Sequence, residues 1–342
     1  MQHSRLLHEV CRLTVSPSYL RERRHRAEHT GMAQAVRDRD TSYLFAWLVE
    51  VFSYQGIADA RASAYMDAHG RVAWADVAQG LHGCPTCPKL ATYWHFEGCG
   101  YAKTARSCAE PELLPTCPLP RHDLRNGRLN QMAYALFLFI RDVCRGDLMG
   151  WIDAQLAEVD APNAPDRAFA MRAALLDPLS RIYGISFKVL AMALAELLLS
   201  ADPARARWVS AGAAMVAVDT LVHNWLHRTG IARQLGREHP YGRLCYESGG
   251  CAEILEDCAR EIDAQLLCPD GPSYFPRLVQ HAVWQFCAES GLDICNGNRV
   301  NDRIGCMQVD CPLFADCAKL SPHSRERRAR TQNAGQVRRP RA

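Results

Sequence analysis

Apolar residues recur at helical spacing along most of the chain. Between Thr41 and Tyr65 they fall on one helical face, and similar patterns run from Leu129 to Val143, from Cys251 to Leu267 and from Tyr274 to Cys287. The first of these faces consists of Leu44, Phe45, Leu48, Val49 and Phe52. No run of alternating apolar and polar residues is long enough to predict a sheet. The pattern therefore predicts an all-α protein.

One segment combines a tight turn with an apolar helix. The sequence predicts a helix from Arg167 to Leu176, and a short apolar segment follows it. A turn at Gly184 to Ser186 then precedes a second, apolar helix, which carries a single lysine, Lys188. Gly184 can adopt a positive φ at little cost, which suits a sharp bend between two helices. The first turn of the second helix presents backbone N–H groups that have no partner within the helix, and such groups bind phosphate. This segment is therefore a candidate phosphate-binding site.

A second segment places an acidic residue at the start of a helix. An apolar run ends at Val218, and Asp219 follows at a position that favours a helix N-cap. The helix predicted after it continues to Ile231. Asp219 is therefore expected to have a fixed side chain.

Together the two segments resemble the signature of the helix-hairpin-helix DNA glycosylases of the endonuclease III-like superfamily. The hairpin reads I-Y-G-I-S-F-K where the family has L-P-G-V-G-x-K, and A-V-D-T matches the start of the family's next helix. Tyr183 replaces the family's proline, Ser186 replaces its second glycine, and the gap between Lys188 and Asp219 is longer. The resemblance implies an all-α, two-lobed glycosylase fold with DNA in the cleft between the lobes.

The resemblance also implies a site. Lys188 would attack the sugar C1′ and displace the base, and Asp219 would stabilise the positive charge on the sugar or help to deprotonate the lysine. Gly184 and Ser186 would hold the DNA backbone. Gln55 matches a family residue that reaches into the duplex, although a turn-capping role is equally compatible with its position. The simpler alternative is that Lys188 contacts a phosphate and Asp219 only caps a helix.

Composition gives Lys188 further weight and limits the partners. The chain has 342 residues and 40 basic residues, of which only Lys89, Lys103, Lys188 and Lys319 are lysine. A lysine can lose its proton and form a Schiff base, whereas an arginine cannot. The formal net charge is only +3, so binding to DNA would depend on local basic patches. We expect a monomer that acts on DNA in the bacterial cytoplasm, associated with the nucleoid, with neither a signal peptide nor a membrane span.

The C-terminal loop has a cysteine pattern typical of a metal centre. Endonuclease III-like relatives hold a [4Fe-4S] cluster here with four cysteines spaced six, two and five, and this chain has gaps of ten, four and five between Cys295, Cys306, Cys311 and Cys317. Zinc is the alternative metal. Arg299 and Arg303 lie within the loop, where they can meet phosphates.

A second group of cysteines lies in an insertion that the family pattern does not contain. The insertion runs over residues 83–121, begins with Cys84, and continues with Cys87, Cys99, Cys108 and Cys117. A loop with little apolar periodicity needs a cross-link to remain ordered. The last four of these cysteines are therefore predicted to bind a second metal, zinc or another iron–sulfur cluster. The alternative is a set of unrelated buried thiols.

These features define the expected organisation and function. The predicted parts are an N-terminal arm at 1–40 that packs with the cluster lobe, a helical barrel at 41–218 with the hairpin at 179–199, a cluster domain at 219–320, and a basic disordered tail at 321–342. The predicted function is base excision by a DNA glycosylase that also cleaves the strand by β-elimination. The alternative is a non-catalytic iron–sulfur protein that binds DNA or senses damage. An iron–sulfur redox enzyme is disfavoured, because no Gly-rich dinucleotide fingerprint follows a strand.

Overall fold

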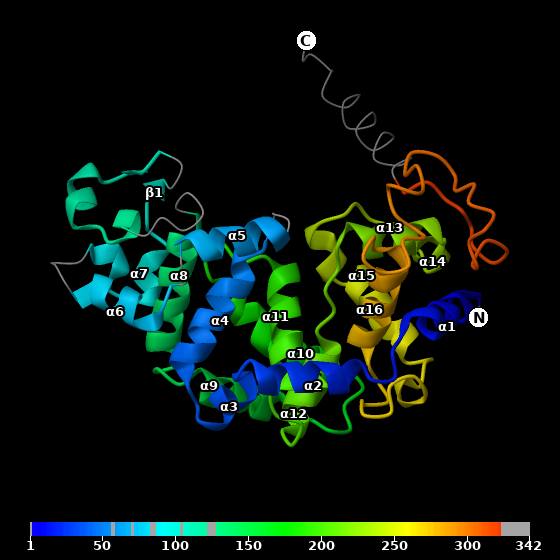
Figure 1. The fold of residues 1–342 in the computed structure, drawn as a ribbon, viewed down its shortest axis with the longest axis horizontal. Helices are drawn as coiled ribbons and strands as arrows, with labels where there is room; N and C mark the ends of the chain where they lie inside the picture. The colour runs from blue at the N-terminus through cyan, green and yellow to red at the C-terminus, as the bar shows by residue number, and fades with distance from the viewer. Residues whose placement is uncertain are drawn as a thin grey trace, which may run out of the picture. The chain divides into compact units, whose positions relative to one another are not determined.

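The chain is helical almost throughout. A computed structural model describes residues 2–55, 59–69, 72–82, 87–102, 105–121 and 128–322. Within these ranges, strand is confined to one antiparallel ribbon, in which β1 (Tyr101–Ala102) pairs with β2 (Ser107–Cys108). The prediction of an all-α protein is confirmed, and Figure 1 shows the order of the helices along the chain.

The chain divides into two compact units. The terminal unit joins residues 1–21 to residues 216–342, and the central unit comprises residues 22–215. The N-terminal segment that belongs with the C-terminal part thus ends at Arg21 and not at residue 40. Cys84 and residues 323–342 of the predicted tail lie outside the described residues.

The terminal unit is a helical cluster built on α16. Both α1 and α13 pack against α16, and their apolar faces form one core with Trp225, Leu226 and Phe286 at its centre, all fully buried. The helix α2 (Tyr19–His29) begins in this unit and continues into the central one. The other elements of the unit are α1 (Gln2–Thr14), α13 (Thr220–Arg228), α14 (Ile231–Gln234), η5 (Arg243–Tyr246), α15 (Cys251–Ala259), η6 (Ala264–Leu266) and α16 (Pro276–Cys287).

One predicted helix of this unit is shorter than expected. Apolar periodicity predicts a helix from Cys251 to Leu267, but α15 ends at Ala259 and a short 3₁₀ turn follows. The side chain of Asp263 accepts a hydrogen bond from the backbone of Gln265, which starts this new turn instead of continuing the old helix. The next helix, α16, begins at Pro276, because proline suits the first position of a helix.

The central unit surrounds the apolar helix α11. This helix packs against α4, α10 and α12. The elements of the unit are α3 (Met32–Arg37), α4 (Thr41–Ser53), α5 (Asp59–His69), α6 (Trp74–His82), η1 (Pro88–Leu90), α7 (Tyr93–Phe96), β1, β2, η2 (Pro111–Thr116), η3 (Leu119–Arg121), α8 (Arg128–Leu138), η4 (Phe139–Val143), α9 (Leu148–Val159), α10 (Arg167–Leu179), α11 (Phe187–Ser200) and α12 (Ala206–Ala214).

One predicted helix of the central unit is confirmed and another is divided. The segment from Thr41 to Tyr65, predicted as one helical face, forms α4, which ends at Ser53, and α5, which begins at Asp59. The helix α4 starts where Asp40 accepts a hydrogen bond of 3.0 Å from the backbone of Tyr43, and its predicted apolar face is buried. The segment predicted as a core helix from Leu129 to Val143 forms α8, and its last five residues form one π-helical turn, η4. The apolar run Met132 to Ile140 is buried throughout.

The structure contains no helix suited to crossing a bilayer within the described part of the chain, since none combines sufficient length with sufficient apolar character.

Candidate functional site

The hairpin between α10 and α11 has the predicted turn. Gly184 has a φ of +81°, in the left-handed region, and the chain then enters α11 with Ser186 at its N-cap. A residue with a Cβ would be strained at this φ, so glycine is required for the bend. The backbone conformation of Gly184 therefore sets the bend of the hairpin, and α11 begins shortly after it.

Gln55 binds the backbone of this hairpin. Its Nε2 donates to the carbonyl of Gly184 at 2.5 Å, and its Oε1 accepts from the backbone N–H of Ser186 at 3.2 Å. The structure thus gives Gln55 the turn-capping role. It also removes the Ser186 amide from the groups that this hairpin can offer to a phosphate, because that N–H already has an acceptor.

Lys188 is half-buried in the first turn of α11, two residues beyond the N-cap. The hairpin before it is flanked by the insertion, since the ring of Tyr183 meets that of Phe96 edge-on, with centroids 6.1 Å apart. Trp94, on the same short helix α7, is 64% exposed. Tyr183 of the hairpin therefore contacts α7 of the insertion.

Asp219 lies in the terminal unit and is held firmly. Its Oδ1 accepts a hydrogen bond of 3.0 Å from the N–H of Val222, so it is the N-cap of α13, and only 9% of the residue is exposed. On the residue before it, the hydroxyl of Tyr246 accepts from the N–H of Val218 at 2.9 Å and donates to its carbonyl at 3.1 Å. The backbone is thus fixed on both sides of the carboxylate. Lys188 lies in the central unit and Asp219 in the terminal unit.

A pocket of about 420 Å³ lies along the same helix. It is lined by residues of α13, by the start of the C-terminal loop and by Tyr241. Burial raises the pKa of Tyr241, and the charge of Asp219 adds to this increase. Asp219 lies beside this recess, because the next residue, Thr220, lines it.

The four cysteines of the C-terminal loop lie near enough for the charges of three of them to act on the fourth, Cys311. We call Cys295, Cys306, Cys311 and Cys317 the C-terminal cysteine group. The pKa of the Cys311 thiol is raised to about 11, first by burial and then by the charges of the other three thiols. The same effects raise the pKa of Cys317. Such a set can ionise together only when a cation compensates the negative charge, which is the condition that a metal centre satisfies.

A buried arginine supports this group. Arg228, at the end of α13, is 1% exposed, and its Nη1 donates to the sulfur of Cys295 at 3.0 Å while its Nη2 forms an ion pair with Asp302. A hydrogen bond from Cys287 and the charge of Arg228 lower the pKa of Cys295 to about 7. The carbonyl of Arg228 also accepts the N–H of Leu320 at 2.9 Å, which fixes the far end of the loop. Arg228 thus connects both ends of the C-terminal cysteine group to α13.

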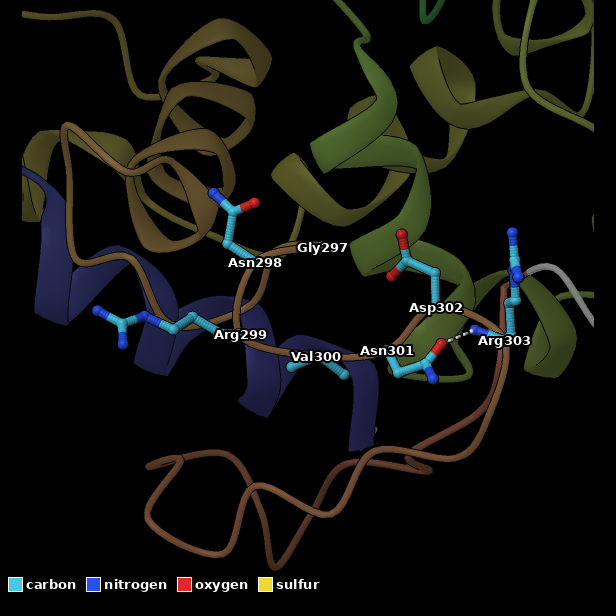
Figure 2. A pocket seen from close by; sticks show the side chains of 7 residues that line it. All are labelled: Gly297, Asn298, Arg299, Val300, Asn301, Asp302 and Arg303. Carbon is cyan, nitrogen blue, oxygen red and sulfur yellow. Dashed lines mark hydrogen bonds between the residues drawn. The ribbon is translucent and has the colours of Figure 1, made fainter.

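Figure 2 shows the part of the loop that carries the two predicted phosphate-binding arginines. Residues 297–303 line an open pocket of about 470 Å³. The buried Asn296 shapes its start, because its Oδ1 accepts the N–H groups of Asn298 and Arg299 at 2.9 and 3.1 Å. Both arginines are exposed, but Arg299 forms an ion pair of 2.6 Å with Asp293. Arg303 is therefore better placed than Arg299 to meet an external anion.

The cysteines of the insertion are also gathered. We call Cys87, Cys99, Cys108 and Cys117 the insertion cysteine group. Burial raises the pKa of Cys117 to about 11, and the charges of the other three thiols contribute to the increase. Burial likewise raises the pKa of Cys99, against hydrogen bonds from the backbone of Tyr101 and from the side chain of Gln131. The predicted ligands of a second metal therefore lie near one another.

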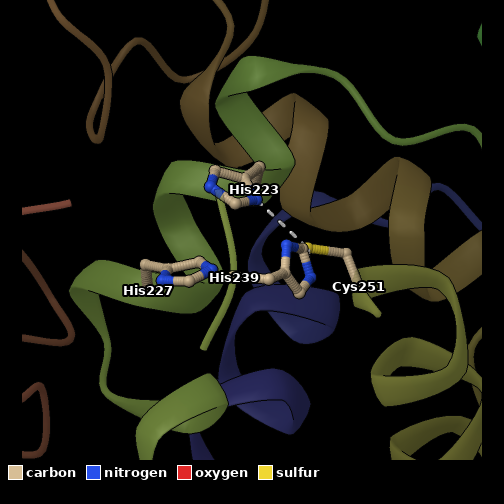
Figure 3. A group of neighbouring side chains, drawn as sticks. All are labelled: His223, His227, His239 and Cys251. Carbon is tan, nitrogen blue, oxygen red and sulfur yellow. Dashed lines mark hydrogen bonds between the residues drawn. The ribbon is translucent and has the colours of Figure 1, made fainter. Parts of the chain in front are cut away.

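A third group was missed in the sequence. His223, His227, His239 and Cys251 each direct one ligand atom into a common space, and these four atoms lie within 4.8 Å of one another (Figure 3). We call them the histidine–cysteine group. Cys245 lies beside it, with its sulfur 3.5 Å from Nδ1 of His223, and hydrogen bonds from Cys251 and His223 lower the pKa of Cys245. The available sequence signal was the His-x₃-His spacing in α13, which places two imidazoles on one helical face.

The three groups differ in tightness. Among the described residues, the histidine–cysteine group is the one in which at least three ligand atoms of His, Cys, Asp or Glu converge within 4.8 Å. A single zinc ion holds thiolates at Zn–S distances of about 2.3 Å, so its ligands must lie closely together. A cubane cluster holds its four thiolates farther apart, because each binds a different iron.

Comparison of the chain with models of protein families, with curated protein sequences and with solved structures finds no match in any of the three.

Proposed function

We propose that this protein is a DNA glycosylase that removes a damaged or modified base through a lysine nucleophile. The observation that carries the proposal is the hairpin: a left-handed Gly184 leads directly into α11, with Lys188 in the first turn of that helix. The capped Asp219 at the start of α13 and the C-terminal cysteine group supply the other parts of the resemblance in the same order along the chain.

The proposed reaction uses the chemistry of an amine. The target nucleotide is flipped out of the stack, since the reacting sugar carbon is otherwise shielded by the duplex. The neutral amine of Lys188 forms a bond to C1′ while the glycosidic bond breaks, and the base leaves with the electron pair of that bond and a proton. The carboxylate of Asp219 stabilises the positive charge that develops on the sugar. Opening of the sugar ring gives a Schiff base, and loss of the 3′-phosphate by β-elimination then cleaves the strand.

The C-terminal cysteine group fits a [4Fe-4S] cluster. Four thiols lie near one another, a buried arginine offsets their charge, and the spacing is looser than a single zinc ion requires. Cys295, Cys306, Cys311 and Cys317 would hold the cluster, whose contribution here is structural. It orders a loop that presents Arg303 to the phosphate backbone.

The decisive test of the proposal is borohydride trapping on DNA that contains an abasic site. The wild-type protein should form a covalent adduct, and Lys188→Gln and Lys188→Arg should form none. The arginine variant is the matched control, because it keeps the positive charge but cannot form a Schiff base. If Lys188 only contacts a phosphate, the wild type will bind DNA without being trapped, and Lys188→Arg will bind as well as the wild type.

Asp219→Asn tests the second residue without disturbing the helix. Asparagine caps helices as well as aspartate does, so α13 should remain intact. We expect base excision from a panel of modified duplexes to fall by about 10²–10⁴-fold, while DNA affinity changes by no more than a few fold. Excision at the wild-type rate by this variant would remove Asp219 from the reaction.

A further inference from the structure

The histidine–cysteine group joins three separate parts of the terminal unit. His223 and His227 lie one helical turn apart on α13, His239 lies in the loop that follows α14, and Cys251 is the first residue of α15. Figure 3 shows the three imidazoles and the thiol turned towards a common centre. All but His239 are buried, and His239 is half-buried. A polar cluster at this depth requires a partner for each of its ligand atoms.

The distances within the group match those around one metal ion. The sulfur of Cys251 lies 3.3 Å from Nδ1 of His223 and 3.4 Å from Nε2 of His239. Around tetrahedral zinc, with Zn–N near 2.0–2.1 Å and Zn–S near 2.3 Å, a nitrogen and a sulfur ligand lie about 3.6 Å apart. The rings of His223 and His227 have centroids 4.2 Å apart, and those of His227 and His239 are 5.5 Å apart. The four side chains therefore need only small adjustments to surround an ion.

The tautomer of His239 is the one that a metal ligand needs. Its Nδ1 lies 3.0 Å from the carbonyl oxygen of Pro240, which can only accept a hydrogen bond, so Nδ1 carries the proton. In the neutral ring, Nε2 then has a lone pair directed at the sulfur of Cys251. Metal-binding histidines commonly donate their other N–H to a backbone carbonyl, which fixes the ring and the tautomer.

We propose that His223, His227, His239 and Cys251 form a binding site for a divalent zinc ion, separate from both cysteine groups. Three imidazole nitrogens and one thiolate are ligands that zinc prefers, and four protein ligands in a buried setting are typical of a structural site. Binding replaces the proton of the Cys251 thiol with the metal. Cys245 lies at the edge of the group and forms a hydrogen bond with His223. It is not required as one of the four ligands.

The site has a definite structural consequence. It attaches the loop at 236–250 to α13, the helix that Asp219 caps. Tyr241, in this loop, has its ring centroid 5.5 Å from that of His223 and forms part of the wall of the 420 Å³ pocket. The zinc ion thus fixes the wall of the recess beside Asp219, and this structural role holds whether or not the protein is a glycosylase.

Metal analysis of the full-length protein tests the proposal. The protein is expressed in zinc-supplemented medium, and manganese, iron, cobalt, nickel, copper and zinc are quantified per chain. The Cys99→Ser background removes zinc held by the insertion cysteine group. In that background we expect one zinc per chain, and its X-ray absorption spectrum should show three nitrogen ligands and one sulfur ligand.

Variants of the ligands should lose this zinc selectively. His227→Gln and Cys251→Ala are each expected to lose it, while the iron content of the chain stays unchanged. Cys258→Ala is the matched control, because Cys258 is equally buried one heptad further along α15 and lies outside the histidine–cysteine group. It should keep the zinc. His239→Gln provides a second, half-buried position in case the buried variants fail to fold.

Two results would overturn the proposal. The first is a folded wild-type chain with less than a tenth of an equivalent of zinc after supplementation, which would leave the group as a hydrogen-bonded network only. The second is full zinc content in both His239→Gln and Cys251→Ala. Because neither result involves DNA, the glycosylase proposal and the zinc proposal can fail independently.

Discussion

The C-terminal and insertion cysteine groups share a ligand set but differ in what surrounds it. Each gathers four thiols in a segment with little regular structure, and the charges of the other thiols contribute to the raised pKa of Cys311 in one group and of Cys117 in the other. At the C-terminal group a buried arginine cation donates to a sulfur, whereas at the insertion group the donors to Cys99 are a backbone N–H and the amide of Gln131. Within the described part of the chain, Cys295 of the C-terminal group is therefore supported by a full charge and Cys99 of the insertion group by neutral dipoles.

This difference indicates how much negative charge each site is built to hold. A cubane with four thiolates is an anion, and a buried cation next to it offsets part of the cost of burial. Neutral donors suit a site of smaller net charge or one that remains closer to solvent. We therefore expect the C-terminal group to bind its metal centre more tightly than the insertion group does.

The largest effect should come from the ligands themselves. Cys311→Ser is expected to remove most of the iron and inorganic sulfide from the purified protein, because a cubane depends on all four thiolates. Cys99→Ser should leave that iron in place and remove only metal held by the insertion. Iron, sulfide and zinc are measured on the same anaerobic samples. Equal iron loss in the two variants would show that the two groups are not separate centres.

The next effect tests the buried cation. Arg228→Met removes the cation beside Asp302 and the thiolates, although Asp302 keeps its hydrogen bond of 3.0 Å from Asn224. Breaking a buried ion pair in this way typically costs about 3–5 kcal/mol. The free energy of unfolding is measured by chemical denaturation with the fluorescence of the tryptophans, among them the buried Trp225. Arg303→Met, an exposed change in the same loop, should alter stability by about 0.5 kcal/mol or less. If both variants unfold at the same denaturant concentration, the charge at Arg228 does not support the group.

The features that the sequence predicted are those that depend on neighbours along the chain. The apolar face of α4, the N-cap at Asp219 and the turn at Gly184 each follow from a few adjacent residues. The two cysteine groups could be predicted for the same reason, because ligands of one metal centre tend to cluster in a loop. The local rule failed for the helix predicted from Cys251, where apolar spacing continues but the side chain of Asp263 starts a new turn.

The missed features depend on residues that are far apart in the sequence. The sequence allows a turn-capping role for Gln55, but no local pattern indicates that the turn lies 129 positions away. The histidine–cysteine group takes its members from one helix, a loop and a second helix. His223 and His227 carry the only local signal for this group, and an imidazole pair on an apolar helix face is as compatible with a core as with a metal site. Identifying such sites requires the packing of the unit.

The smallest expected effect tests the neutral support of the insertion cysteine group. The buried Gln131 donates from Nε2 to the carbonyl of Tyr101 at 2.9 Å and also hydrogen-bonds Cys99. Gln131→Met keeps the volume but removes these bonds, at a cost of about 1 kcal/mol, which corresponds to a roughly fivefold faster local opening. Hydrogen exchange of the amides of β1 and β2 measures this opening directly. Thr92→Val, which removes only the cap of α7, should leave that ribbon unchanged. Exchange that accelerates across the whole central unit would instead place Gln131 in the global core, and the two cysteine groups would then no longer differ in the strength of their support.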